Sequence, residues 1–156
     1  MDLQVTENMA KELMAQWGLD GWTLVWTDAQ SQFGQCRYGP RQIALSRVLV
    51  ALNDEAEVRD TVLHEIAHAL VGHAAGHGAR WRMACLQVGA RPDRTRNFET
   101  PPMKWTGTCP KGCGFVMGRR TLFKEARTMA CPRCCEKYNG GAWHPALKLI
   151  WTENVL

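Results

Sequence analysis

The chain has 156 residues and a mass of 17.6 kDa, a size that suits one domain, or one domain with a small appendage. Its apolar share of 46% and charged share of 22% are ordinary for a soluble globular protein. No stretch resembles a membrane span or secretory signal, so we expect neither a membrane nor a secreted protein. The net charge of +4 is uneven, because residues 1–79 carry five Lys/Arg against ten Asp/Glu, whereas residues 80–156 carry fourteen against five.

The first quarter of the chain predicts one helix and a small sheet. Apolar residues at helical spacing over residues 3–17 indicate an amphipathic helix that ends at Gly18. Strand-forming residues follow at 22–26, 35–38 and 42–45, and Gly39 with Pro40 marks a turn between the last two segments. We expect these three strands to form a small antiparallel sheet.

The next segment predicts two helices and then a boundary. Asn53 or Asp54 can cap a helix that runs to about Gly72, and a shorter helix over about 78–88 precedes Gly89, which suits its C′ position. Prolines punctuate a polar connector, and residues 105–140 are dense in Cys and Gly. We therefore expect a first domain over residues 1–100 and a second over residues 101–156.

The segment His64-Glu65-Ile66-Ala67-His68 lies inside the longer predicted helix. Four residues turn a helix by about 400°, so His64 and His68 share one face with a net offset of about 40°. Two imidazoles placed in this way can bind one metal ion, and Glu65 can reach a metal-bound water. This pattern predicts the core of a zinc peptidase active site.

A catalytic zinc usually has three protein ligands and one open water position, so a third ligand is needed. The candidates are His73, His77 and Glu99. His73 would face away from His64 if the helix continued unbroken, since it lies about 180° around. His77 follows two glycines at which the chain can leave the helix and fold back, so it is our preferred third ligand. A metzincin arrangement is excluded, because Val71 and Ala74 replace its glycine and third histidine.

General metal chemistry then predicts the catalytic role of each group. A zinc ion lowers the pKa of its water toward about 7 and polarises the scissile carbonyl. Glu65 would take the water proton as general base and return it to the leaving amine. The groups that stabilise the oxyanion are open at this point, with Tyr38 and the arginines around Arg91 as candidates.

The stretch from Thr61 to Trp81, TVLHEIAHALVGHAAGHGARW, resembles the SprT-like metallopeptidases, in which HExxH is followed by a His-Gly-x-x-aromatic segment. The segments around Cys36 and residues 43–46, and residues 89–92 followed by Arg94 and Phe98, resemble other parts of that family. The resemblance extends from about Trp22 to Cys134.

The resemblance implies a fold, ligands and an activity. The fold class would be α+β, with a zincin-like metallopeptidase core (N-terminal helix, small antiparallel sheet, active-site helix) and a C-terminal zinc ribbon. His64, His68 and His77 would be the zinc ligands, Glu65 the catalytic base, and Trp81 a packing aromatic. Well-studied relatives such as Spartan are DNA-dependent proteases that cleave proteins crosslinked to DNA, and the resemblance implies that activity here.

Two cysteine pairs in the second domain predict a structural zinc site. Cys109 and Cys113 form a C-x3-C knuckle, and Cys131 and Cys134 form a C-x2-C knuckle. Four thiolates can close a tetrahedral zinc site, which would make two zinc ions per chain, one catalytic and one structural. Cys135 would mirror the first spacing and stays open as an alternative to Cys134. We expect residues 115–117 and 121–123 to form a hairpin around Gly118.

The basic second half favours a polyanionic partner. We expect single- or double-stranded DNA to contact basic side chains near the predicted hairpin, namely Arg119, Arg120, Lys124 and Arg127. The leading hypothesis is a monomeric zinc endopeptidase that acts on DNA-bound or DNA-crosslinked proteins. Reduced cysteines place it in the cytoplasm, associated with the nucleoid, or in the nucleus. The alternatives are a non-catalytic zinc-stabilised nucleic-acid-binding protein, and a peptidase that docks on another protein through the ribbon.

Overall fold

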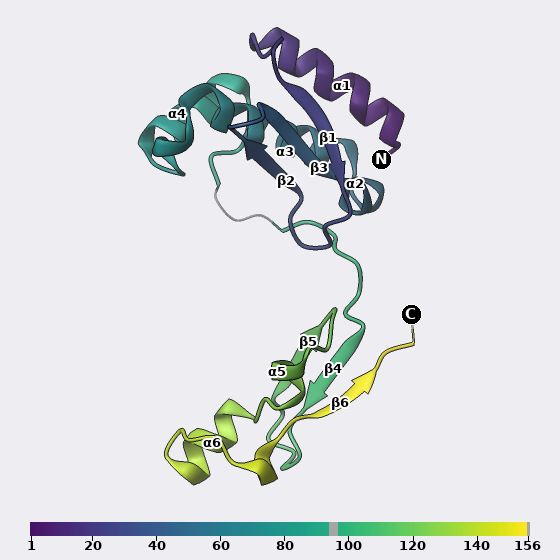
Figure 1. Cartoon of the computed structure of the whole chain (residues 1–156), viewed down its shortest axis with the longest axis vertical. Coiled ribbons are helices and arrows are strands. Elements are labelled where there is room, and N and C mark those ends of the chain that lie inside the picture. Colours follow the sequence, from purple (N-terminus) through teal and green to yellow (C-terminus); the bar gives the residue numbers. More distant parts are fainter. Residues whose placement is uncertain (94–96, 156) are drawn as a thin grey trace. The chain divides into compact units, whose positions relative to one another are not determined.

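The computed structural model describes residues 1–93 and 97–155, and it folds as two compact units, Met1–Pro101 and Pro102–Leu156 (Figure 1). Arg94, which contributes to the family resemblance, lies outside the described residues. None of the helices in the described ranges combines the length and the apolar character that a bilayer-spanning segment requires. Both units combine helices with a three-stranded sheet, which confirms the predicted α+β class.

The first unit begins with the predicted helix, α1 (Leu3–Gln16). The Asp2 side chain accepts hydrogen bonds from the backbone N–H groups of Gln4 and Val5, which satisfies donors that the first turn leaves free. Gly18 follows the helix in a left-handed conformation at φ 71°. The helix buries Leu13 and Met14 of the predicted apolar face together with Ala10, while Leu3 at its first turn is exposed.

The three predicted strands form, as β1 (Thr23–Thr27), β2 (Gly34–Arg37) and β3 (Gln42–Ser46), but the predicted purely antiparallel sheet is wrong. The order is β1-β3-β2, in which β2 and β3 are antiparallel whereas β1 and β3 run parallel. The tight turn at 38–41 makes β2 and β3 antiparallel neighbours, and β1 pairs with the other edge of β3. As a result, β2 is an edge strand of the sheet.

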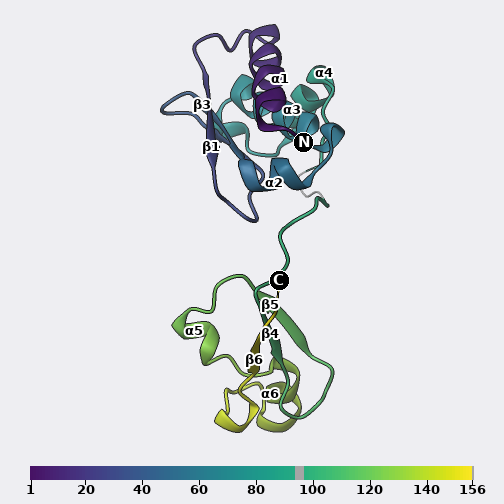
Figure 2. The same cartoon turned by 90° about the vertical axis from the view of Figure 1, so that its right-hand side faces the viewer.

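Helices gather on one face of this sheet (Figure 2). A short helix, α2 (Arg47–Leu52), which the sequence analysis does not predict, leads into the long helix α3 (Glu55–Val71). The structure settles the cap of α3, because the Asp54 carboxylate accepts a hydrogen bond from the Glu57 N–H at 2.9 Å. Asn53 instead bonds the backbone of Leu49 and, through both side-chain polar atoms, that of Glu99.

The rest of the first unit closes around α3. The short 3-10 turn η1 (His73–Ala75) leads to α4 (Ala79–Val88), which ends at Gly89 in the left-handed conformation, as predicted. Arg91 ties the following segment back to α3, since its guanidinium contacts Asp60 at 2.9 Å and Glu57 at 2.6 Å. The core is a continuous cluster that includes Ile43, Ile66 and Trp81, so the metal-binding motif is built on the most buried helix of the unit.

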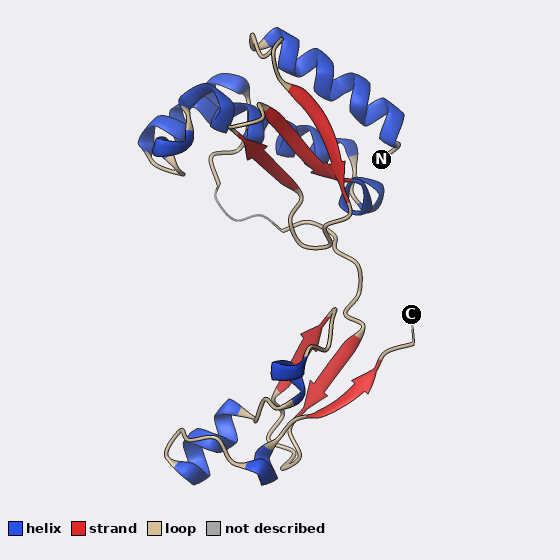
Figure 3. Ribbon diagram, viewed as in Figure 1, coloured by secondary structure: helices blue, strands red, loops and turns tan. Residues whose placement is uncertain are grey.

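The second unit consists of a small antiparallel sheet with short helices (Figure 3). The strands β4 (Trp105–Thr108), β5 (Val116–Arg119) and β6 (Ile150–Glu153) have the order β5-β4-β6. The helices are α5 (Lys124–Arg127) and α6 (Pro132–Asn139), and a 3-10 turn, η2 (Pro145–Leu147), precedes β6.

The predicted hairpin around Gly118 is wrong. Gly118 lies inside β5 and pairs with Thr106 of β4, while residues 121–123 form no strand. A side chain at position 118 would meet the Met103 Cγ atom at 2.6 Å, so the glycine allows close packing where a turn was expected. Consequently, Arg119 is the last residue of a strand and not part of a turn.

Candidate metal centre and active site

Helix α3 presents His64 and His68 on one face, one turn apart. Their ring centroids lie 5.0 Å from each other, within the span over which two imidazoles can share an ion. Only 8% of the His64 surface is exposed, and His68 is half-buried, so the pair lies where the helix leaves the core. The i,i+4 spacing thus produces the geometry that the sequence predicts.

His77 returns to these two histidines after α3 has ended. Gly72 at φ 80° and Gly76 at φ 48° both adopt a positive φ, which glycine tolerates without a steric cost and which lets the chain reverse between them. The structure brings a ligand atom from each of His64, His68 and His77 within 4.8 Å of the others. His73 lines the same cavity but is exposed, and Glu99 does not line it. Among the described residues, the group whose ligand atoms converge contains neither of them.

The spacing of the nitrogens suits a tetrahedral metal. The Nε2 atoms of His68 and His77 lie 3.1 Å apart, close to the value of about 3.4 Å for two nitrogens on one tetrahedral zinc ion. Three imidazole donors with an open side match zinc and other borderline metals better than magnesium or calcium, which prefer oxygen ligands. The histidine group can therefore hold a metal ion.

The Trp81 indole of α4 packs against all three imidazole rings. The indole is fully buried and stacks on His68 with 5.2 Å between the ring centroids and an interplanar angle of 23°. It also meets His64 edge-on at 4.8 Å and His77 at 4.6 Å. One rigid side chain thus restricts all three rings, which lowers the conformational entropy that they lose when they bind an ion.

Burial keeps one of these ligands in its metal-binding form. Burial, and then the neighbouring His77, lowers the pKa of His68 to about 4 from its ordinary value near 6.5. Neutral imidazole is the form that donates a lone pair to a metal. His68 is therefore already deprotonated at neutral pH, and protons do not compete for its lone pair.

Glu65 lies beside the histidines and against strand β2. Only 7% of its surface is exposed, and it lines a cavity of about 390 Å³ together with His64, His68 and His77. A Cβ atom at Gly34 of β2 would come within 2.8 Å of the Glu65 Cγ and Oε1 atoms. The sequence does not indicate this role for Gly34, although a glycine in or next to a strand can mark such a close approach.

We expect the substitution Gly34→Ala to reduce any activity that depends on Glu65 by about 100-fold, since a displacement of about 1 Å has an effect of this size. The added methyl group must push the carboxylate or move β2 away from α3. Metal content measured on the same sample should stay unchanged. The matched control is Gly39→Ala, because Gly39 has ordinary φ and open space around its ideal Cβ. Equal activity of Gly34→Ala and Gly39→Ala would show that this approach does not position Glu65.

Of the candidates for oxyanion stabilisation, Tyr38 lies at the cavity of the histidines and Arg91 does not. Tyr38 lines the cavity of the histidines, and burial, followed by Cys36 and Glu65, raises its pKa to about 12. Its hydroxyl therefore keeps its proton at neutral pH and can act as a donor. Arg91 does not line that cavity, because its guanidinium is engaged by Glu57 and Asp60.

The second cluster lies in the other unit and consists of Cys109, Cys113, Cys131 and Cys134, whose sulfurs all lie within 4.8 Å of one another. The Cys109–Cys134 and Cys113–Cys131 sulfur distances are both 3.5 Å. Four sulfurs on one tetrahedral zinc ion would lie about 3.8 Å apart, so the cluster fits a closed metal site of the zinc-ribbon type. Cys135 is buried but is not part of this group.

Three thiols of the cluster have shifted pKa values. Backbone N–H groups of Cys113 and Lys111 lower the pKa of Cys109 to about 6. Burial, and then the neighbouring sulfurs, raises the pKa of Cys134 to about 12, and burial also raises that of Cys131. At neutral pH Cys109 is therefore largely a thiolate, whereas Cys131 and Cys134 keep their protons. A bound cation must displace these protons, so metal binding to the cluster releases protons.

The four basic residues expected to contact DNA lie at the end of β5 and on α5. Arg119 is half-buried, with its guanidinium 5.8 Å from the centre of the Phe123 ring and 3.7 Å from the Met129 sulfur. Arg120 is half-buried, while Lys124 and Arg127 are exposed. The structure therefore leaves Lys124 and Arg127 as the members of this set that are most accessible to a polyanion.

Comparison with known proteins gives one consistent result. A family model described as the SprT-like family matches residues 4–102. Protein SprT of Serratia proteamaculans is 32% identical over 117 residues, covering 67% of this chain and 67% of that protein. The SprT proteins of an Enterobacter species and of Escherichia coli O157:H7 are 34% and 33% identical, over 61% and 62% of this chain. In both cases the match spans only 64% of the relative's own length, slightly less than two thirds.

Proposed function

This chain belongs to the SprT-like family, and from that premise we propose that it is a zinc-dependent endopeptidase acting on proteins that are bound or crosslinked to DNA. The observation that carries the proposal is the arrangement of three histidines and one glutamate around a single cavity. A purely structural metal site would not need a buried carboxylate beside its open side. This favours a catalytic metal over an inert one.

Each residue of the cavity has a separate role in the proposed peptide hydrolysis. His64, His68 and His77 would hold the zinc ion, which would supply polarisation of the scissile carbonyl and a lower pKa of water. Glu65 accepts the proton of the attacking water and delivers it to the leaving amine, which otherwise would depart as an unstable anion. Tyr38 keeps its proton and donates a hydrogen bond to the oxygen that gains charge.

Strand β2 offers a backbone edge for the substrate. It lies at the edge of the sheet, and Gly34, Gln35 and Cys36 line the cavity of the histidines. An extended polypeptide can add to such an edge through main-chain hydrogen bonds, which recognise no particular sequence. Unfolded or locally unfolded polypeptide is therefore the substrate form that this site suits.

The second unit supports the DNA part of the proposal. Residues 102–156 carry nine Lys/Arg against three Asp/Glu, an excess that favours a polyanion. Cationic groups lie over two of its aromatic rings, with Lys137 5.1 Å from the centre of Tyr138 and Arg133 5.9 Å from that of Phe115. Tyr138 is exposed and Phe115 is half-buried, and basic residues next to aromatic rings are typical of surfaces that bind single strands. Since the matched relatives are bacterial, we propose the nucleoid as the place of action.

The test compares one protein substrate in two forms, crosslinked to a DNA strand and free. We expect faster cleavage of the crosslinked form, and a difference that shrinks as salt increases, because phosphate contacts release counterions. The double substitution Lys124→Glu with Arg127→Glu should remove most of that difference. Arg59→Glu, an exposed charge reversal on α3, is the matched control and should preserve it. If the wild type cleaves both substrate forms at equal rates, the proposed role of DNA is rejected.

A further inference from the structure

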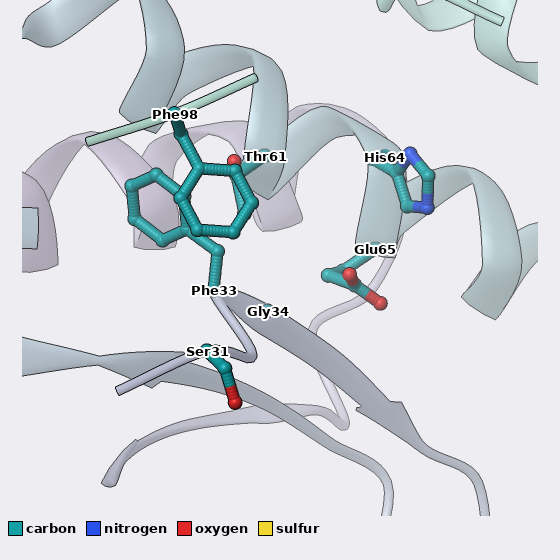
Figure 4. Close-up of a pocket in the computed structure, with 7 residues that line it drawn as sticks. All are labelled: Ser31, Phe33, Gly34, Thr61, His64, Glu65 and Phe98. Atoms are coloured by element: carbon teal, nitrogen blue, oxygen red, sulfur yellow. The ribbon is translucent and has the colours of Figure 1, made fainter. Parts of the chain in front are cut away.

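A second, smaller cavity opens next to the one that holds the histidines. Its lining comes from three separate segments: Ser31, Phe33 and Gly34 before and in β2, Thr61, His64 and Glu65 on α3, and Phe98 after α4. His64, Glu65 and Gly34 line both cavities, so this pocket is continuous with the proposed catalytic residues. We call it the Phe33–Phe98 pocket (Figure 4).

The two ends of the pocket differ in chemistry. At one end the rings of Phe33 and Phe98 lie against each other, with 5.0 Å between their centroids and an angle of 58° between their planes. At the other end lie Glu65 and His64, whose side chains point away from the two phenylalanine rings (Figure 4) and also line the cavity of the histidines. An apolar end and a polar end suit an amino-acid residue, whose side chain is apolar and whose backbone is polar.

The dimensions of the pocket limit what it can hold. Its volume is about 150 Å³, well below the range of about 300–1,000 Å³ that is typical of sites for whole small molecules. A cavity of about 150 Å³ is large enough for a benzene ring. The pocket therefore has room for one side chain and not for a cofactor.

We propose that the Phe33–Phe98 pocket binds one apolar side chain of the substrate, of the size of leucine or phenylalanine, adjacent to the bond that is cut. The inference rests on the proposed function, because it makes this pocket a determinant of cleavage position. Glu65 borders the pocket, so an acidic side chain of the substrate would be repelled by the Glu65 carboxylate. The rings of Phe33 and Phe98 disfavour any charged side chain, because such a group would lose its water there without gaining a partner.

The closing experiment measures binding and does not depend on cleavage. The full zinc-loaded chain is titrated with N-acetyl-leucinamide, N-acetyl-phenylalaninamide, N-acetyl-glycinamide and N-acetyl-aspartate amide while the NMR signals of the Gly34 and Thr61 amides are followed. We expect the two apolar amides to bind at least about 10-fold more tightly than the other two, which is the scale of discrimination by a hydrophobic pocket.

Two variants and a control locate the binding. Ser31 is exposed and lines the pocket, so Ser31→Trp should fill it and abolish the preference for apolar amides. Gln30→Trp places the same bulk on an exposed neighbour outside the pocket lining and should leave the preference unchanged. Phe98→Ala removes one half-buried wall and should weaken binding of the leucine amide.

The outcomes separate this inference from the proposed function. Equal binding of all four amides, or a preference that survives in Ser31→Trp, would overturn the pocket assignment. If the preference is found, cut sites mapped in an unfolded protein should show large apolar residues enriched at one position beside the cleaved bond. Selective binding of the apolar amides without any proteolysis would support the pocket as a binding site and reject the peptidase proposal. Proteolysis without enrichment would reject the role of the pocket in specificity.

Discussion

The substitution Glu65→Gln should reduce polypeptide cleavage by about 100- to 10,000-fold, the range that a positioned general base contributes. Glutamine has nearly the same shape as glutamate but cannot accept the proton of the attacking water. The variant should still fold and bind two metal ions, since Glu65 is not one of the grouped ligands. Cleavage is measured on an unfolded protein substrate, and metal content on the same sample.

Glu55→Gln is the matched control for this result, because Glu55 is an exposed residue in the first turn of the same helix. It should cleave at the wild-type rate. A Glu65→Gln protein with the same activity as Glu55→Gln would refute the proposed role of Glu65. It would also favour the alternative in which the histidine site is structural and the protein only binds nucleic acid.

The second large effect concerns the cysteine cluster. Cys134→Ala should lower the zinc content from two ions per chain to one and unfold the second unit, because structural zinc contributes on the order of 10–16 kcal/mol in zinc-finger peptides at neutral pH. The expected mechanism is the loss of one of four thiolates that together close the site. Zinc analysis and the thermal unfolding of the whole chain measure the two effects.

The adjacent substitution Cys135→Ala supplies the comparison, since Cys135 is buried beside the cluster but is not a member of it. It should keep both metal ions and cost only the packing of one small buried side chain. If Cys135→Ala loses zinc while Cys134→Ala retains it, the ligand assignment is reversed and the spacing of the second knuckle equals that of the first.

The sequence predicted best those features that depend on local spacing. His64 and His68 share a helix face because α3 has a fixed period. Gly72 and Gly76 after the helix indicated that the chain could turn back and place His77 beside them. The family resemblance added the fold and is supported by the match over residues 4–102. Cap residues, such as Asp54 at α3 and Gly89 at α4, follow from equally local hydrogen bonding.

The features that the sequence did not predict depend on contacts between distant segments. The parallel pairing of β1 with β3 depends on which edge of the β2–β3 hairpin β1 joins, and alternation along a strand does not encode that choice. Gly118 resembled a turn residue, but it allows Met103 to pack on β5. The same holds for the site: Gly34 of β2 approaches Glu65 and Thr61 of α3, and Phe98 joins Phe33 only after folding.

The most direct test of the metallopeptidase account is a metal add-back measurement on the wild-type chain, with Glu65→Gln taken through the same steps. Both proteins are stripped of metal by a chelator, refilled with zinc, and assayed for cleavage of an unfolded protein before and after each step. The account predicts that wild-type cleavage disappears on stripping and returns with zinc, while the Glu65→Gln protein regains zinc without activity. Cleavage by the metal-free wild type, or equal recovery in the two proteins, would contradict it.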